Sequence, residues 1–255
     1  MAFRLCPMLL PPLIDYHVHI DLYPDYQEVF AECKKQSINT LAVTTTPRAW
    51  ERNVEMAGGS TNIRVGLGLH PQVVAQFYSE IAIFEKHLAR SRFVGEVGLD
   101  ASSNHYSSFP RQKEIFERVL RLCAEQKGKV LSIHSVRASR EVLDLLEKHL
   151  LPDRGKAVLH WFSGSAPEAE RAVKLGCYFS VNGQTLQKES GCAVLRRLPL
   201  TRLLTETDGP FTLTKGKPTR PSDVEGTVVA LAALFKMEEP RMRQILNENL
   251  QTLES

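Results

Sequence analysis

The chain has 255 residues, of which 43% are hydrophobic and 24% are charged, and its formal net charge is +3 at pH 7. These values are typical of a globular protein and exclude a small disulfide-stapled module, a collagen-like fibre and a polytopic membrane protein. A net charge of +3 is too small to indicate a nucleic-acid partner and too small to exclude one.

The first twelve residues predict a short lead-in before the folded domain. Their apolar run is broken by Pro7, Pro11 and Pro12, and no cleavage site of small residues follows it, so we do not interpret it as a signal peptide. The cysteines are scattered and form no C-x-x-C pair, which is typical of free thiols in a cytoplasmic protein. No stretch approaches the ~18 uninterrupted apolar residues that a membrane span requires.

From residue 13 on, short apolar runs alternate with segments of helical periodicity. The apolar runs are nearly continuous, as in parallel strands buried on both faces, and they predict strands over 13–19, 40–44, 63–68, 93–97, 130–134, 157–160, 178–181 and 202–205. The helical segments cover 26–36, 48–56, 80–91, 111–126, 139–148, 167–175, 190–198, 221–235 and 240–250.

Eight strand–helix units in about 250 residues predict an α/β fold, a (β/α)₈ TIM barrel in a single domain over residues 13–255. A doubly wound open sheet shows a similar alternation and is the alternative. The chain has no P-loop and no G-x-G-x-x-G segment, which disfavours the nucleotide-binding versions of that sheet.

Two histidines, His17 and His19, end the first predicted strand. Because side chains alternate along a strand, both imidazoles point to the same face, which at a barrel strand can be the interior. Two imidazoles there favour a transition metal over magnesium alone. Taken alone, such a pair is more often a hydrogen-bonded feature of the core.

Further ionisable residues lie at other strand ends, and they change that interpretation. Glu96 lies within the fourth predicted strand, His134 and His160 end the fifth and sixth, and Asp208 follows the eighth. The carboxyl ends of barrel strands form one face, and a buried ionisable group needs a partner. We therefore predict a divalent cation among His17, His19, Glu96, His134, His160 and Asp208.

Six separated segments, DYHVHID, GLGLHP, GEVGLD, IHSVRAS, LHWFSGS and TETDGPF, occur in the order found in the TatD-type metal-dependent deoxyribonucleases. The chain resembles this family from about residue 13 to 211, and within it most resembles the member that bacterial anti-phage Qat cassettes carry. The resemblance implies a hydrolase of phosphodiester bonds, a 3′–5′ exonuclease on single-stranded DNA. It also implies anti-phage defence, with other subunits of a defence complex as partners and no membrane.

The resemblance further implies two divalent metal ions, Mg²⁺, Mn²⁺ or Zn²⁺. His17, His19 and Asp208 would hold the first ion, and Glu96 would bridge to a second, which His134 and His160 complete. Two cations ~3.5–4 Å apart can hold both the attacking and the leaving oxygen of a phosphodiester. Asp208 could also accept the proton of the attacking water, so we expect Asp208 and Glu96 to be the catalytic carboxylates.

Three residues beside these ligands are candidates for substrate binding. His70 matches a family position near the substrate phosphate, although a hydrogen bond to its own loop is an equal alternative. Ser163 lies in the loop after the sixth strand and is expected to approach the substrate backbone. Glu206 either orients the substrate site or points across the strand into the structure. Asp100 is expected to secure its loop rather than react.

Two departures from the family pattern bear on substrate contacts. The family's arginine after the fifth strand is displaced by one position, so that Val136 intervenes and Arg137 is the candidate contact. Trp161 replaces the usual small cysteine after His160 and is expected to narrow or line the pocket. Basic loop residues are expected to add positive charge on the same face: Arg137, Lys188, Lys215, Lys217 and Arg220.

Two other functions stay open for the same residues. An amidohydrolase or a deacylase of D-aminoacyl-tRNA could use the same dinuclear centre, but related amidohydrolases often bridge their metals with a modified lysine where this chain has Glu96. The other alternative is a scaffold subunit of a larger complex, against which the retained ligand residues count.

Overall fold

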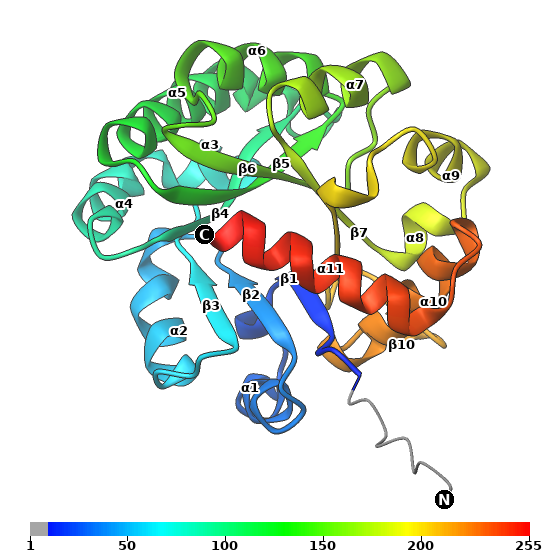
Figure 1. Cartoon of the computed structure of the whole chain (residues 1–255). Coiled ribbons are helices and arrows are strands. Elements are labelled where there is room, and N and C mark those ends of the chain that lie inside the picture. Colours follow the sequence, from blue (N-terminus) through cyan, green and yellow to red (C-terminus); the bar gives the residue numbers. More distant parts are fainter. Residues whose placement is uncertain (1–9) are drawn as a thin grey trace, which may run out of the picture.

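Eight parallel strands follow one another around a barrel in the part of the chain that the structure describes, residues 10–255 (Figure 1). In this computed structural model the strands are β1 Ile14–Val18, β2 Asn39–Val43, β3 Ile63–Gly66, β4 Phe93–Asp100, β5 Lys129–Val136, β6 Gly155–His160, β7 Tyr178–Val181 and β8 Leu203–Thr205. Most of the predicted lead-in, residues 1–9, lies outside the described range.

Hydrogen bonds at two seams close the barrel. Strands β1–β3 form one sheet and β4–β8 another, and β3 is joined to β4 by bonds from Leu67 N to Phe93 O (3.0 Å) and from Gly95 N to Leu67 O (2.9 Å). On the other side, the chain after β8 bonds to β1 through Asp208 N to His17 O at 2.9 Å. The predicted barrel is therefore confirmed, and the open sheet is excluded.

Helices surround the barrel and connect its strands. They are α1 Tyr26–Lys35, α2 Trp50–Ala57, α3 Val74–Phe77, α4 Ile81–Leu88, α5 Phe109–Gln126, α6 Ser139–His149, α7 Ala166–Lys174, α8 Gly183–Leu186, α9 Glu189–Leu195, α10 Val224–Leu234 and α11 Glu239–Glu254. A hairpin of β9 (Leu213–Thr214) and β10 (Lys217–Pro218) precedes α10. No helix within residues 10–255 combines the length and the apolar composition needed to cross a bilayer.

The core lies between the strands and the inner faces of the helices. Every residue of β1 is buried, as is all of β4 after Phe93, because each strand has the barrel interior on one side and helices on the other. Phe116 of α5 and Leu143 of α6 belong to the same buried cluster as Leu131 of β5. Side chains at the carboxyl ends of these strands are therefore held on a rigid frame.

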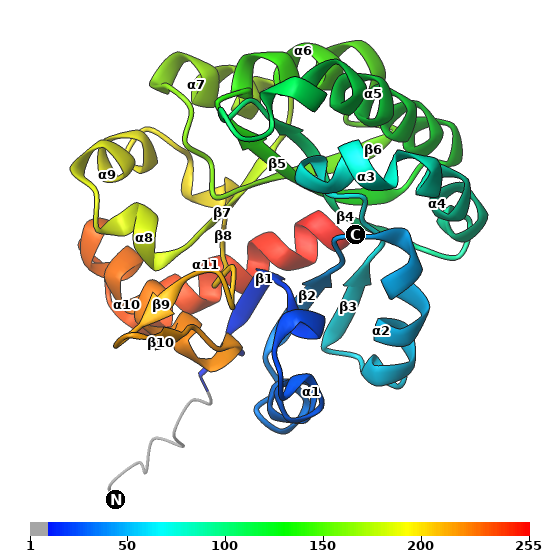
Figure 2. The ribbon, with the colours of Figure 1, turned by 180° about the vertical axis from the view of Figure 1, so that it is seen from behind.

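Helix α11 covers the amino-terminal end of the barrel (Figure 1). Asn249 donates through Nδ2 to the backbone oxygens of Leu200 (2.7 Å) and Leu203 (2.8 Å), which lie just before and in β8. Arg64 of β3 forms an ion pair of 2.6 Å with Glu254. Figure 2 shows the opposite end, where the strands end and the connecting loops begin.

Candidate metal centre

His17 and His19 project from the end of β1 and its following residue, and both are buried. Their Nε2 atoms lie close to the same carboxylate oxygen, Oε2 of Glu96, at 3.3 Å and 3.1 Å. Nδ1 of His17 is hydrogen-bonded to Ser132 Oγ of β5 at 2.7 Å, which leaves its Nε2 to face the centre. The alternation of side chains along β1 thus brings both imidazoles inside the barrel mouth, as expected.

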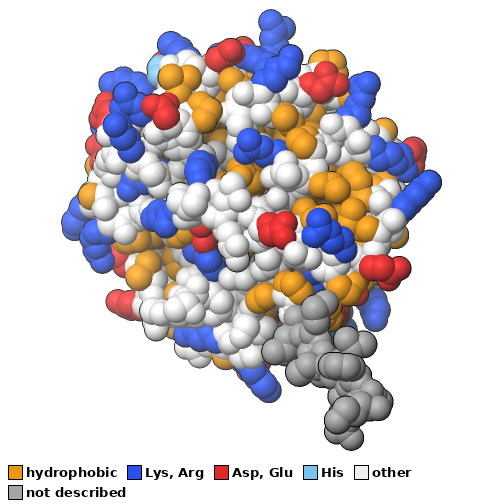
Figure 3. All heavy atoms as spheres, in the orientation of Figure 1, with side chains coloured by type: hydrophobic (Ala, Val, Ile, Leu, Met, Phe, Trp, Pro, Cys, Tyr) orange, Lys and Arg blue, Asp and Glu red, His pale blue; other side chains and the backbone are white. Residues whose placement is uncertain are grey.

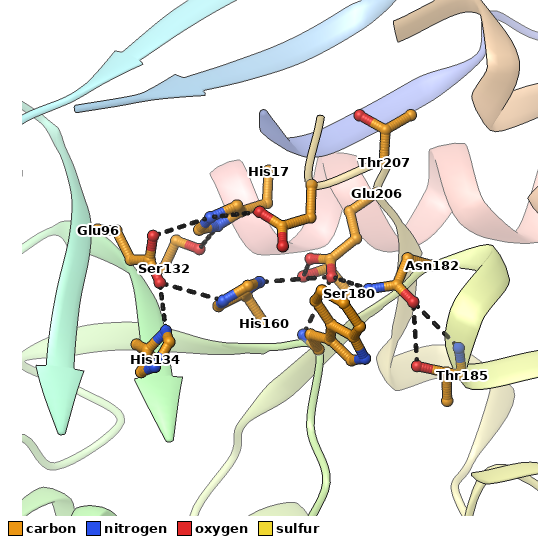
Figure 4. A network of polar contacts seen from close by, with 12 residues as sticks. His17, Glu96, Ser132, His134, His160, Ser180, Asn182, Thr185, Glu206 and Thr207 are labelled. Atoms are coloured by element: carbon orange, nitrogen blue, oxygen red, sulfur yellow. Dashed lines mark hydrogen bonds and ion pairs between the residues drawn. The ribbon is translucent and has the colours of Figure 1, made fainter. Parts of the chain in front are cut away.

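Glu96 of β4 lies between two sets of imidazoles (Figure 4). Its Oε2 faces the two histidines of β1, whereas its Oε1 faces His134 Nδ1 at 2.6 Å and His160 Nε2 at 3.1 Å. Gly98, two residues on, permits the close packing of β4 on β5, because its φ is +140° and a Cβ there would lie 2.1 Å from the His134 carbonyl oxygen. The two oxygens of one carboxylate are therefore presented to two separate groups of nitrogen atoms.

Asp208 reaches the same centre from the segment after β8. Its Oδ1 lies 3.7 Å from His17 Nε2 and 3.6 Å from His19 Nε2. The preceding residue, Thr207, is held by buried Asp15, which accepts from Thr207 N (2.8 Å) and from Thr207 Oγ1 (2.6 Å). Burial raises the pKa of Asp208 to about 7.

The donor set fits divalent cations. Three overlapping groups have ligand atoms within 4.8 Å of one another: His17 with His19 and Asp208, His17 with Glu96 and His160, and His70 with Glu96 and His134. His17 Nε2 and His19 Nδ1 are buried without a hydrogen-bond partner among the described residues. Buried imidazoles and carboxylates gathered in this way are typical ligands of zinc, manganese and related ions. The first group equals the predicted first metal site.

The predicted second site is arranged less simply. His134 and His160 both approach Oε1 of Glu96, and their ring centroids are 5.6 Å apart. However, the ring of His160 also stacks on that of His17, with the centroids 3.8 Å apart, and His70 joins His134 in the third group. The structure brings all six predicted ligands together, and it adds His70 beside them.

Glu206 lies behind His160, on the side of the ring opposite Glu96 (Figure 4). It is fully buried, and its Oε1 is 3.4 Å from His160 Nδ1. The same oxygen accepts from Asn182 Nδ2 (3.0 Å) and from Trp161 N (3.1 Å), and Oε2 accepts from the Ser180 hydroxyl. Of the two alternatives for Glu206, the structure shows the side chain that points into the protein, and a direct substrate contact is not supported by its position. The side chain points into the barrel, where it orients His160.

Asp100 has the corresponding position behind His134. Its Oδ2 is 3.1 Å from His134 Nε2, on the side of the ring opposite Glu96. It also accepts from Gln72 Nε2 and from Ser102 N, both at 2.8 Å, so it secures its loop as expected. Burial opposes the ionised form, but hydrogen bonds to His134, Ser102 and Gln72 outweigh it and hold the pKa of Asp100 below its usual range.

The charges within the centre depend on one another. Burial tends to raise the pKa of Glu96, but the surrounding imidazoles outweigh burial and hold it well below the usual value. Burial tends to lower the pKa of His160, but Glu206 and Glu96 on either side raise it well above the usual value. Glu96 is therefore ionised, in a ring of positive or metal-binding groups.

A pocket of about 540 Å³ opens above the centre. His70 and Ser163, two of the predicted substrate contacts, line it, and so do Val136 and Trp161. Arg137 does not line it: this residue is exposed and has a left-handed backbone, with φ of +52°, which turns it away from β5. The prediction for Arg137 is therefore not supported by its position.

His70 is oriented by the backbone. Its Nδ1 accepts a hydrogen bond from Gln72 N at 3.1 Å, so the proton of a neutral ring is on Nε2. This Nε2 faces Oε1 of Glu96 at 3.1 Å. Burial lowers the pKa of His70, which favours the neutral ring. The expected hydrogen bond to its own loop is confirmed, and it leaves the other nitrogen as a donor facing the centre. The contact of His70 with a substrate phosphate stays a prediction.

Several residues of the site were not predicted. Ser132 lies two residues before His134 in β5, and Ser180 and Asn182 alternate in the same way at β7, so strand periodicity alone could have placed them on the interior face. Exposed Phe211, which was not predicted either, lines the pocket.

Two of the expected basic residues differ in their positions. Lys188 lines the pocket, as expected. Arg220 instead forms ion pairs with Asp25 and Glu32, so its charge is compensated.

A family model described as TatD related DNase matches residues 14–255. The chain belongs to the TatD family. Within this family of metal-dependent hydrolases, it is 29% identical to the uncharacterized metal-dependent hydrolase YjjV of Escherichia coli K12, over 94% of this chain and 96% of that one. The crystal structure of the same relative superposes with a TM-score of 0.84 at 28% identity, over 94% of this chain and 97% of that one.

Two relatives carry names that specify nucleic acids. The deoxyribonuclease Tat-D of Schizosaccharomyces pombe is 30% identical over 77% of this chain and 67% of its own length. The human 3′-5′ RNA nuclease TATDN2 is 30% identical over 83% of this chain, which corresponds to 30% of the human protein. The TatD-family member described here is thus a metal-dependent hydrolase with nuclease relatives.

Proposed function

We propose that this protein is a deoxyribonuclease that hydrolyses phosphodiester bonds from the 3′ end of single-stranded DNA. The observation that carries the proposal is the position of Glu96, whose two carboxylate oxygens face two separate sets of imidazoles. Such a carboxylate can join two cations, and a pair of cations suits phosphodiester cleavage because it stabilises both the attacking and the leaving oxygen. The deoxyribonuclease from fission yeast among the relatives supports the same chemistry.

Each side chain has a part in this reaction. His17, His19 and Asp208 would hold one cation and Glu96, His134 and His160 the other, and the cations supply Lewis-acid activation of water and of the phosphate. Asp208 lines the pocket, where its carboxylate can accept the proton of the attacking water. His70 also lines the pocket, and its Nε2 can donate a hydrogen bond to a phosphate oxygen.

The preference for a single strand follows from the depth of the centre. His134 and His160 are 6% and 5% exposed, so a scissile phosphate must enter the pocket to reach them. The flexible end of a single strand can do this, whereas the phosphates of an intact duplex are held at the surface of a wide helix. We therefore expect double-stranded DNA to be cleaved only where its ends fray.

We also propose that the protein acts in the cytoplasm, where thiols stay reduced. The four described cysteines, Cys33, Cys123, Cys177 and Cys192, are free and buried. Burial raises the pKa of Cys33, Cys123 and Cys177 to about 12, so these thiols are unreactive. The anti-phage role and the partner subunits rest on the sequence resemblance alone and stay predictions.

Purified protein tested on a panel of substrates would distinguish the candidate functions. The panel holds 5′-labelled single-stranded DNA, the same strand with a blocked 3′ end, its blunt duplex, RNA of the same sequence, a D-aminoacyl-tRNA and a cyclic amide, each with Mg²⁺, Mn²⁺ or Zn²⁺. We expect a ladder of products that shortens from the 3′ end of the single-stranded DNA whose 3′ end is free. Faster hydrolysis of the RNA, the aminoacyl ester or the amide would assign the centre to that substrate instead.

Two variants show whether cleavage belongs to this centre. His134→Ala removes a centre residue, and we expect it to abolish the ladder. His149→Ala removes a histidine that contacts Glu117 on the helical layer, and we expect it to cleave like the wild type. Metal-independent cleavage, or equal cleavage by the two variants, would contradict the proposal.

A further inference from the structure

A second pocket of about 360 Å³ adjoins the pocket above the metal centre. It lies between the loop after β6 and the helices α8 and α9. Trp161, Ser163 and Lys188 line both pockets, so the two share a wall. Among the residues that the structure describes, none of the six predicted metal ligands lines this second pocket. It is thus next to the centre but not part of it.

The second pocket has apolar and aromatic walls together with several polar side chains, among them buried Ser180 and Thr185. Its walls include Phe162 and Phe179, whose rings meet edge to face with centroids 5.4 Å apart, and the aliphatic side chain of buried Leu195. Exposed Ser163 and Lys188 lie where the two pockets meet. Apolar, partly aromatic walls with a few polar groups are typical of a site for a small organic ring.

The walls of the second pocket are held in place. A Cβ at Gly191 of α9 would lie 2.4 Å from the Thr185 carbonyl oxygen of α8, so only glycine permits this close packing of the two helices. Thr185 N donates to Asn182 Oδ1 at 3.1 Å, and Asn182 Nδ2 donates in turn to Glu206 Oε1 at 3.0 Å (Figure 4).

Glu206 also fixes the pocket relative to the metal centre. Its Oε1 accepts from the backbone nitrogen of Trp161, at 3.1 Å, and lies beside Nδ1 of His160. The shared wall and a centre histidine are therefore positioned by one buried carboxylate. A ligand in the second pocket would be held at a fixed offset from the reacting phosphate.

We propose that the second pocket is a nucleobase subsite, which receives one heterocyclic base of the strand whose phosphate lies at the centre. This inference rests on the proposed nuclease function. The sugar–phosphate backbone would cross the shared wall, where the ammonium group of Lys188 complements its negative charge and the indole of Trp161 offers an aromatic surface. Because every base has a flat apolar face, the subsite tolerates any sequence.

Removal of single bases from the substrate tests this subsite. Short single-stranded DNAs carry one abasic residue at successive positions from the 3′ end, and kcat and KM are measured for each. We expect one position at which the missing base raises KM by about 5- to 100-fold, the range for stacking of one base, with smaller effects elsewhere. A KM that is the same for every abasic position would overturn the subsite.

A variant that fills the pocket shows where that base is bound. Val194→Trp places a large ring in the second pocket only, since Val194 does not line the first. We expect it to raise KM for intact DNA by the same factor as the missing base does in the wild type. In this variant, the abasic residue should cause no further rise in KM. Hydrolysis of methyl p-nitrophenyl phosphate, too small to reach both pockets, should be unchanged. Val229→Trp, at an exposed valine of α10, is the matched control.

A milder pair of variants covers the case in which Val194→Trp does not fold. Trp161→Phe keeps an aromatic surface and should retain the sensitivity to the abasic position, whereas Trp161→Ala should lose it. Equal abasic sensitivity in these two variants would overturn the inference while leaving the nuclease function intact. A wild-type protein that cleaves no nucleic acid would overturn the nuclease function and the subsite with it.

Discussion

Two carboxylates lie against His160, one on each side of its ring. Glu96 Oε1 is 3.1 Å from Nε2, at the centre, and Glu206 Oε1 is 3.4 Å from Nδ1, behind it. His134 has the same arrangement between Glu96 and Asp100. Carboxylates behind metal-binding histidines fix the ring and raise its basicity, so Glu206 and Asp100 are positioning residues.

Replacement of Glu206 should weaken metal binding rather than the chemistry itself. Glu206→Gln keeps the shape of the side chain but removes its charge, and we expect metal affinity to fall by about 10- to 100-fold, with a smaller change in kcat at saturating metal. Calorimetric titration of the metal-free protein with a divalent metal ion measures this affinity. Glu80→Gln, at a buried glutamate that contacts Arg48 instead, is the matched control. An unchanged metal affinity would exclude the positioning role of Glu206.

Replacement of His70 should weaken cleavage of DNA rather than metal binding. With Nδ1 occupied by Gln72 N, His70 presents a donor rather than a lone pair, so His70→Ala should retain bound metal. We expect kcat/KM for DNA to fall by about 10- to 100-fold, as for the loss of one hydrogen bond to a charged group. Metal analysis and steady-state kinetics on the same sample separate the two roles. A protein that loses its metal would show that His70 is a ligand.

Strand alternation explains why the sequence could predict most of the centre. It places His17 and His19 on one face, and the convergence of strand ends in a barrel adds the other four residues. Arg137 and Asp208 have positive φ angles, of +52° and +51°, and no periodicity reveals where such turns aim a side chain. For this reason the sequence did not predict that Arg137 lies outside the pocket, and it left two orientations open for Glu206.

At the scale of elements, the barrel strands and the longer helices were predictable, whereas the shortest helices and the hairpin were not. Helices α3 and α8 have four residues each, and β9 and β10 have two each, which is too few to show a period. Yet α8 forms a wall of the second pocket. The final helix was predicted over 240–250, but its role as a cover for the barrel depends on contacts distant in sequence, such as Asn249 with Leu203.

Asn249 should be important for stability and unimportant for the metal centre. Asn249→Ala leaves the partly buried carbonyl group of Leu200 and the buried one of Leu203 without their side-chain donor, and we expect the free energy of unfolding to fall by about 1–3 kcal/mol. The melting temperature should fall by several degrees in a thermal scan. Gln251→Ala, on the exposed face of α11, should have little effect. Weaker metal binding in folded Asn249→Ala would contradict the separation of the two barrel ends.

At the scale of the whole molecule, the formal net charge is only +3. On the face that α11 covers, Lys and Arg side chains are dispersed, with Asp and Glu among them (Figure 3). Many are paired, as Arg64 is with Glu254 and Arg220 with Asp25. The attraction for a nucleic acid is therefore expected to be local, at the pocket that Lys188 lines and where cations would be bound.

A local attraction predicts a weak dependence of binding on salt. Each phosphate neutralised by a basic side chain contributes about 0.7 to the slope of log affinity against log salt for a single strand. We expect a total slope of only about one or two, which Lys188→Ala reduces by about 0.7. Titration of fluorescent DNA at several salt concentrations measures this. Lys127→Ala, at an exposed lysine after α5, is the control, and a steep slope unaffected by Lys188 would indicate an extended basic surface instead.

The central claim is that phosphodiester cleavage depends on cations that Glu96 joins. It is tested most directly by titrating protein that a chelator has stripped of metal with Mn²⁺. Cleavage of single-stranded DNA and the amount of bound metal are measured on the same samples. We predict that the cleavage rate rises until two ions are bound per chain, and that Glu96→Gln shows no cleavage at any Mn²⁺ concentration. Cleavage by the metal-free protein, or full activity of folded Glu96→Gln, would contradict the claim.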